Sequence, residues 1–187
     1  MKYRPGRFLP LFNMSRMAPT SDQAGFYRFA WVTKHIPSAD RLARSSSPHY
    51  ILHDADQDLT DDSIWFLQEQ KIEHVISLNS RADDAVIRKK LNDNHIEYTA
   101  LAVRDYAAPT LEQLAEGNAS YRKHRGGTLV WCGYGHGRTG TMITALQIYA
   151  EQDNGENKQD VSRDDYRMNR VESAGQYDIL DKLKESS

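Results

Sequence analysis

The chain has 187 residues, of which 39% are hydrophobic and 27% are charged, and this composition is typical of one soluble globular domain. The net charge of −2 argues against bulk nucleic-acid binding, and the lack of a long apolar run argues against a membrane span. A single cysteine excludes an internal disulfide and fits a reducing compartment, or a secreted protein that needs no disulfide. No secretory signal peptide is visible, so we expect a protein of the cytoplasm, or one delivered to a host cytosol.

The charge is distributed unevenly along the chain. Residues 1–50 carry eight Lys or Arg and two Asp, a net of +6, so the remainder carries −8. Residues 1–25 show no clear periodicity, whereas the aromatic-rich stretch Phe26–Val32 is expected to be a short element packed on the body. We interpret residues 1–40 together as a basic, irregular N-terminal arm ahead of a domain that spans residues 41–187. Such an arm would help to collect an anionic ligand, or would be only a solvated tail.

From residue 50 onward, predicted strands and helices alternate. Helix starts are indicated by Thr60, which precedes two aspartates, and by the capping box from Thr110 to Gln113. We expect strands at residues 50–52, 74–78, 96–103 and 128–131, a helix that begins at Thr60, and further helices at 83–94, 110–125, 142–149, 162–168 and 172–183. Strands separated by helices predict βαβ units, so the expected fold class is a single α/β domain with a short, largely parallel sheet flanked by helices.

The segment from Trp131 to Gly140 joins a predicted strand to a buried helix and carries the strongest chemical signal. Three glycines follow Cys132 at alternate positions, and they let successive N–H groups converge on one anion. The helix N-terminus adds its dipole, and Arg138 can hold two anion oxygens with its planar fork. The same positive environment favours the thiolate form of Cys132, which is a nucleophile. An ordinary buried thiol would leave the glycines and Arg138 unexplained.

Cys132 to Thr139 resembles the Cys-x5-Arg-[Ser/Thr] signature of the protein tyrosine phosphatase superfamily, in its dual-specificity-like branch. The resemblance implies a metal-independent phosphatase without a cofactor, in which Cys132 forms a phosphocysteine and Arg138 holds the phosphate. The Thr139 hydroxyl would stabilise the departing thiolate. The substrate-binding residues would be those inside the loop, namely Gly133, Tyr134, Gly135, His136 and Gly137.

One position departs from the family pattern. Trp131 stands where the family usually has a histidine that organises the loop and its thiolate. His136, inside the loop, would restore positive charge if protonated, or would be a solvated histidine at the loop tip.

The family's general acid lies on a loop that follows a strand, well before the cysteine. Asp105 directly follows the predicted strand 96–103, so the resemblance makes it the acid, although it would otherwise be a surface turn residue. Asp83 and Asp84 are alternatives, but they lie at a helix start after a different strand.

Three further stretches resemble the family, which extends the resemblance over about residues 40–183. They are Arg44–Pro48, Val75–Asn79 and Arg170–Gln176. Gln176 would orient the hydrolytic water, or would be a helix-capping or surface amide.

The substrate class stays open at this point. We expect phosphotyrosine, phosphoserine or phosphothreonine in proteins, with an inositol phosphate or phosphoinositide as the alternative. A non-catalytic module that binds phosphorylated partners is a second alternative, but it does not require Cys132, Arg138 and Asp105 together.

Overall fold

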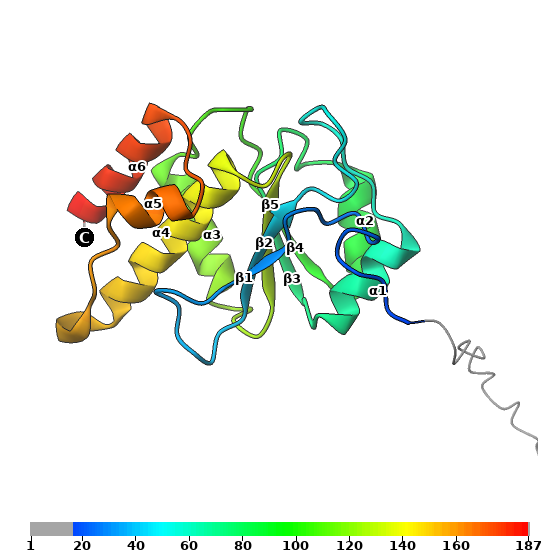
Figure 1. Cartoon of the computed structure of the whole chain (residues 1–187), viewed down its shortest axis with the longest axis horizontal. Coiled ribbons are helices and arrows are strands. Elements are labelled where there is room, and N and C mark those ends of the chain that lie inside the picture. The colour runs from blue at the N-terminus through cyan, green and yellow to red at the C-terminus, as the bar shows by residue number, and fades with distance from the viewer. Residues whose placement is uncertain (1–16, 187) are drawn as a thin grey trace, which may run out of the picture.

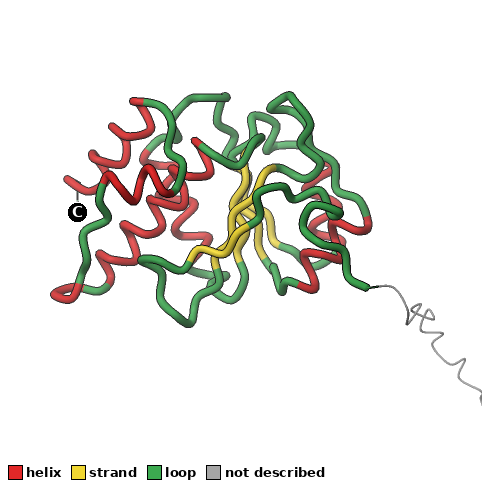
Figure 2. Tube along the Cα trace, in the orientation of Figure 1, coloured by secondary structure: helices red, strands yellow, loops and turns green. Residues whose placement is uncertain are grey.

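Five strands form one sheet at the centre of the protein, in the order β1-β2-β5-β3-β4 (Figures 1 and 2). The structure is a computed structural model, and it describes residues 17–186. The strands are β1 (Ala30–Val32), β2 (Leu42–Ser46), β3 (His74–Ser77), β4 (Glu97–Ala100) and β5 (Thr128–Cys132). The helices are α1 (Asp61–Glu69), α2 (Ala85–Asp93), α3 (Leu111–Tyr121), α4 (Gly137–Asp153), α5 (Arg163–Met168) and α6 (Ala174–Glu185), with a 3₁₀ turn at Gly155–Asn157. The pair β1–β2 is antiparallel and all other pairs are parallel, which confirms the predicted fold class.

Helices cover both faces of the sheet: α1 and α2 lie on one face, and α3 to α6 lie on the other (Figure 1). Successive side chains of a strand point to opposite faces. In β5, therefore, Leu129 and Trp131 join the core under α1 and α2, whereas Val130 and Cys132 join the core under α4. This alternation places the predicted nucleophile on the side of the sheet where the buried helix α4 begins.

Most helix starts follow the capping chemistry in the sequence. The hydroxyls of Thr60, Thr110 and Ser162 accept hydrogen bonds from backbone N–H groups three residues further on, and each completes a capping box. Asp84 caps α2 by accepting from the N–H groups of Val86 and Ile87. These caps satisfy N–H groups that have no partner inside the helix.

Two strand assignments from the sequence differ from the structure. Residues 50–52 form no strand, and Ile51 and Leu52 are 74% and 75% exposed. The missed strand β2 has the sequence Leu-Ala-Arg-Ser-Ser, whose small and polar residues give no apolar signal although they are mostly buried. The predicted strand at 96–103 is real but shorter, because β4 ends at Ala100.

The described part of the predicted N-terminal arm packs against the domain. Ala24 and Phe26 are fully buried, and the Phe26 ring stacks on Phe66 with centroids 5.5 Å apart. Strand β1 then forms one edge of the sheet. The basic residues before residue 17 lie outside the described part. Within residues 17–186, no helix has the length and apolar character needed to cross a membrane.

Candidate active site

The carboxyl ends of the four parallel strands meet at one edge of the sheet, and the segments that follow β2, β4 and β5 line a cavity of about 210 Å³. This is where ligands bind in open parallel sheets. Cys132 ends β5 and is 2% exposed, and α4 begins five residues later. The N–H of Gly135 donates a hydrogen bond to the Cys132 sulfur over 3.3 Å. The structure thus brings the predicted nucleophile to the floor of a cavity beside a helix N-terminus.

Two arginines hold the outer side of the phosphate loop, which we define as residues 133–136. Arg28 donates from Nε to the Tyr134 carbonyl over 2.6 Å, and Arg44 donates from Nη2 to the Gly135 carbonyl over 2.8 Å. A trans peptide group is planar, so its N–H points away from its C=O. The outward carbonyls therefore turn the N–H groups of Gly135 and His136 toward the cavity. Gly135 has φ +92°, a conformation that side-chain-bearing residues rarely adopt.

Arg138 lies under the cavity and is tied to three other loops. Its guanidinium donates to the carbonyls of Leu78 and Val103 over 3.2 and 2.8 Å. It also pairs through both terminal nitrogens with Asp54, and through Nη2 with Asp105 over 2.8 Å. The group that the sequence predicts to hold phosphate is thus fixed in place by the segments after β2, β3 and β4.

Arg138 and Asp54 each stabilise the charged form of the other. Burial alone would raise the pKa of Asp54, but hydrogen bonds from Arg138 and Ser80 outweigh burial and hold that pKa below its ordinary value. Burial alone would lower the pKa of Arg138, but the bond to Asp54 and the charge of Cys132 raise it above its usual range. Both groups are therefore ionised at neutral pH.

Asp105 lines the same cavity as Cys132, with half of its side chain exposed. One carboxylate oxygen accepts from Arg138 and from the N–H of Tyr106. The alternative candidates, Asp83 and Asp84, do not line this cavity, and Asp84 is the N-cap of α2. Among the acids named from the sequence, Asp105 is thus the one that faces the predicted nucleophile.

The remaining predicted site residues take different roles in the structure. Thr139 is fully buried, and its hydroxyl has no hydrogen-bond partner in the described residues, so its role toward the Cys132 thiolate stays a prediction. Gln176 lines the cavity, but it completes the capping box of α6 and donates to the Ala107 carbonyl over 3.1 Å. Its amide therefore ties α6 to the loop that carries Asp105.

His136 does not supply positive charge at neutral pH. Burial lowers its pKa, and the nearby cations Arg44, Arg28 and Arg170 lower it further, below the ordinary value of about 6.5. Burial also lowers the pKa of Arg44, to about 10, which still leaves Arg44 charged. Arg28 and Arg44, which are bonded to the carbonyls of Tyr134 and Gly135, rather than His136, therefore supply positive charge beside the phosphate loop. Trp131 itself faces the opposite core, where its Nε1 donates to the Ser77 hydroxyl over 2.8 Å.

Sequence reasoning missed three residues that shape this site. Asp54 follows β2, and because β2 itself was not predicted, nothing placed Asp54 at the same sheet edge as Cys132. Arg28 lies in the segment interpreted as an arm. Tyr50 was assigned to a strand, whereas it lines the cavity.

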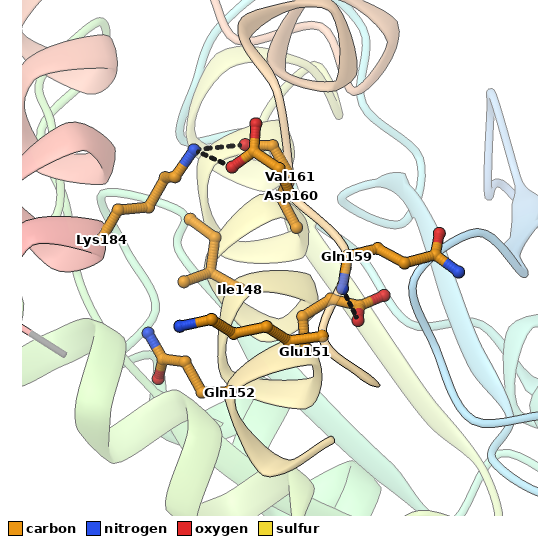
Figure 3. A pocket seen from close by; sticks show the side chains of 8 residues that line it. Ile148, Glu151, Gln152, Gln159, Asp160, Val161 and Lys184 are labelled. Carbon is orange, nitrogen blue, oxygen red and sulfur yellow. Dashed lines mark hydrogen bonds and ion pairs between the residues drawn. The ribbon is translucent and has the colours of Figure 1, made fainter. Parts of the chain in front are cut away.

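A second cavity of about 230 Å³ lies at the C-terminal end of α4 (Figure 3). Lys184 reaches toward it but is bonded to the Asp160 carboxylate and the Val161 carbonyl, over 2.6 and 2.9 Å. Glu151 accepts from the Gln159 N–H over 2.8 Å. Lys184 and Glu151 therefore already have hydrogen-bond partners in this second cavity. The cavity is also remote from Cys132, which precedes the N-terminal end of α4.

Residues 44–178 match the family model described as PTP-SAK, the DSP-PTPase phosphatase domain of Swiss Army Knife proteins. The match spans most of the chain, so the chain belongs to this family of dual-specificity-type protein tyrosine phosphatase domains. No curated protein matches the sequence.

Several solved phosphatases share the fold. Tk-PTP in its active form is 22% identical with a TM-score of 0.60, over 81% of this chain and 99% of that chain. A kinase-associated phosphatase with a substituted catalytic cysteine is 13% identical with a TM-score of 0.64, over 86% and 95%. The core domain of the PP-IP phosphatase Siw14 from S. cerevisiae is 16% identical with a TM-score of 0.54, over 83% and 84%. At these identities the likeness describes the fold alone.

Proposed function

We propose that this protein hydrolyses phosphate monoesters through a covalent phosphocysteine on Cys132, without a metal ion. One observation carries the proposal: a single cavity brings together the Cys132 sulfur, the Arg138 guanidinium and the half-exposed carboxylate of Asp105. These three groups supply a nucleophile, a phosphate holder and a proton donor.

In the first step the Cys132 thiolate attacks phosphorus and the bond from phosphorus to the ester oxygen breaks. The leaving oxygen takes the proton of the Asp105 carboxyl group. Arg138 and the inward N–H groups of the phosphate loop hold the equatorial oxygens, where the charge of the transition state is spread. This step requires Arg138 to turn part of its fork from the carboxylates to the phosphate.

In the second step a water molecule attacks phosphorus and gives its proton to the Asp105 carboxylate. The bond from phosphorus to sulfur breaks, inorganic phosphate leaves, and the thiolate is restored. The buried hydroxyl of Thr139 is suited to donate a hydrogen bond to that thiolate. Atoms and charges balance over the two steps, and Asp105 returns to its protonated state.

Proteins carrying phosphotyrosine, phosphoserine or phosphothreonine are the substrates we propose. An inositol phosphate is the second candidate, favoured by the fold shared with the PP-IP phosphatase Siw14. A module that only binds phosphorylated partners would not need Asp105 beside Arg138.

Substitution of Cys132 by serine tests the covalent mechanism. We expect Cys132→Ser to abolish hydrolysis of p-nitrophenyl phosphate, because a serine hydroxyl is not ionised at neutral pH. Binding of vanadate, measured by calorimetry, should persist, since Arg138 and the loop N–H groups remain. Near-normal turnover in this variant would overturn the proposal.

A further inference from the structure

The guanidinium of Arg138 has two faces that can bind an anion with a pair of parallel hydrogen bonds. One face is formed by both terminal nitrogens, and the other by Nε and Nη2. Asp54 occupies the first face, because it pairs with both Nη1 and Nη2. On the second face, Nη2 donates to Asp105 over 2.8 Å, and Nε has no partner in the part of the chain that the structure describes. The second face is therefore only half occupied.

Asp54 is held on its face by more than Arg138. Its carboxylate also accepts from the N–H of Ser80 over 3.1 Å, and its carbonyl accepts from the side chain of Asn79. Its side chain is 13% exposed, and it lies so close to the phosphate loop that any side chain at Gly133 would collide with it. Breaking a buried ion pair is costly, because each charge is left without its partner. Asp54 should therefore stay on Arg138 when a ligand arrives.

Asp105 is held much less firmly. One carboxylate oxygen accepts from Arg138 and from the N–H of Tyr106, and the other has no partner among the described residues. Half of the side chain is exposed. An ion pair that is open to solvent and made through a single bond contributes little. A phosphate dianion that binds to Nε and Nη2 of Arg138 would therefore displace Asp105.

The backbone that carries Asp105 is fixed, so its release needs only a rotation of the side chain. The N–H of Ala107 donates to the Arg104 carbonyl over 3.0 Å, which closes a turn around Asp105 and Tyr106. Tyr106 has φ 59°, a left-handed value that β-turns use at their third residue. From α6, the amide of Gln176 donates to the Ala107 carbonyl. The released carboxylate therefore remains at the cavity.

Displacement changes the surroundings of the Asp105 carboxylate in two ways. It loses the cation of Arg138, and it gains a dianion as a neighbour. Both changes favour the protonated form of a carboxyl group. The protonated form is the one that a general acid needs.

The cavity offers the released carboxylate no second cation. Among residues 17–186, Arg138 is the one arginine or lysine that lines it. The other titratable groups in its lining are Tyr50, Asp54, Tyr106, Cys132, Tyr134, His136 and Glu172. Burial, and after it the charge of Asp105, raises the pKa of Tyr50, so this hydroxyl stays neutral. The lowered pKa of His136 keeps its ring neutral at neutral pH, and the ring lies 3.8 Å from the carboxylate of Glu172.

We propose that Arg138 is an exchange point, at which the substrate phosphate takes Nε and Nη2 and releases Asp105 to take up a proton. The proton comes from solvent, and no covalent bond changes in this step. The proposal rests on the proposed function, since it describes how the same site prepares its acid only after phosphate is bound. Asp54 keeps the guanidinium in place during the exchange.

Proton uptake on binding of sulfate to the full-length Cys132→Ser protein tests the exchange without turnover and without the thiol. Sulfate is a tetrahedral dianion with no titratable proton near neutral pH. Calorimetric titration at about pH 6, in buffers of different ionisation enthalpy, gives the number of protons taken up per sulfate bound. We expect between about 0.3 and 1 proton, because Asp105 exchanges a cation for an anion as its neighbour.

Three variants on the same background assign the proton. Asp105→Asn should remove most of the uptake and lower the Kd of sulfate about three- to tenfold, because a carboxylate no longer competes for Nη2. Glu172→Gln is the matched control: Glu172 lines the same cavity with a 44% exposed side chain, but it pairs with His136 rather than with Arg138. It should keep the uptake. Asp84→Asn, at the N-cap of α2, should change neither quantity.

The outcomes separate the exchange from the proposed function. Equal uptake with and without Asp105→Asn, or loss of uptake in Glu172→Gln instead, would overturn the exchange even if the wild-type protein hydrolyses p-nitrophenyl phosphate. Uptake that depends on Asp105, without hydrolysis by the wild-type protein, would support the exchange and overturn the catalytic function. A failure of sulfate to bind would contradict both, since both require Arg138 to hold the anion.

Discussion

The guanidinium of Arg138 is shared between two carboxylates that differ in exposure. Asp54 is 13% exposed and pairs with both terminal nitrogens, whereas Asp105 is 50% exposed and pairs with one. A bidentate, buried partner fixes the orientation of an arginine. A partner at the solvent side can instead exchange protons with water and substrate. The two carboxylates therefore suit different tasks, Asp54 positioning Arg138 and Asp105 transferring protons.

Replacement of Asp105 by asparagine should lower kcat by roughly 10²–10⁴ for a phosphopeptide, the usual contribution of a positioned acid–base group. The loss should be smaller for p-nitrophenyl phosphate, whose leaving group needs little protonation. Steady-state kinetics with both substrates measure the difference. Asp84→Asn is the control, since asparagine still caps α2. A damaging Asp84→Asn with a silent Asp105→Asn would refute the assignment of the acid.

At the scale of elements, the phosphate loop depends on a segment outside the matched family region of residues 44–178. Arg28 belongs to that segment, and it holds the Tyr134 carbonyl and covers the Tyr134 ring. Arg44, from β2, holds the next carbonyl. Residues that are distant in sequence therefore fix the direction of the N–H groups of the phosphate loop.

Arg28→Met should therefore raise the Kd of vanadate about tenfold, because the loss of a charge-assisted hydrogen bond frees the loop N–H groups to turn. Arg41→Met is a close control. Arg41 likewise donates to a carbonyl, that of Gln70, and lies over a ring, that of Trp31. It precedes the amino end of β2, whereas the phosphate loop follows the carboxyl end of β5. Calorimetric titration gives the Kd, and the melting temperature shows whether both variants are equally folded.

A second variant separates the contact with the Tyr134 ring from the charge and the hydrogen bond. Arg28→Lys keeps the positive charge and a donor for the Tyr134 carbonyl but loses the planar group that covers the Tyr134 ring. Vanadate binding that is restored fully by lysine would mean that the contact with the ring does not contribute to positioning the loop.

The sequence predicted those elements whose signals are local. Capping residues such as Thr60 and Thr110 fix a helix start through bonds within three residues, so both starts were predicted correctly. Strand β2 is defined by its neighbours on both sides rather than by apolar residues, and it was missed. Ile51 and Leu52 gave a false strand because an exposed apolar patch and a short buried strand have the same local pattern.

The same distinction applies to the site. Cys132 and Arg138 belong to one short motif and were found from it, and the structure places both in one cavity. Asp54 and Arg28 meet that motif only through the sheet order, in which β5 lies between β2 and β3. Contacts of this kind depend on the packing of the whole chain, which no local pattern encodes.

At the scale of the whole molecule, a buried polar cluster joins the segment after β1 to α4 and α5. Asp165 pairs with Lys34, and Glu151 accepts from His35 over 2.8 Å. Burial alone would raise the pKa of Asp165 and of Glu151. Hydrogen bonds from Lys34 and Ser162 instead hold the pKa of Asp165 below its ordinary value. Hydrogen bonds from Gln159 and His35 likewise hold the pKa of Glu151 below its ordinary value. The cluster ties the N-terminal part of the described chain to the helices behind the site.

A carboxylate whose folded-state pKa is lowered stabilises the fold above its unfolded pKa, and this stability is lost as the pH falls. The pKa values in the unfolded chain are about 3.9 for Asp and 4.3 for Glu. The free energy of unfolding should therefore decrease as the pH is lowered below about 5. Asp165→Asn should destabilise the protein at pH 7 and flatten this acid decline, as measured by urea unfolding at several pH values. Asp164→Asn, on the exposed side of the same helix, is the control. An unchanged acid decline in Asp165→Asn would contradict this role.

The most direct test of the account is detection of phosphate on Cys132 during turnover. Asp105→Asn should slow hydrolysis of the phosphocysteine, because Asp105 also activates the water, while p-nitrophenyl phosphate still allows the first step. We predict that acid quenching during the reaction, followed by peptide mass spectrometry, finds phosphate on the peptide containing Cys132, and finds none in Cys132→Ser. Turnover with phosphate on another residue, or with no phosphorylated protein at all, would contradict the central claim.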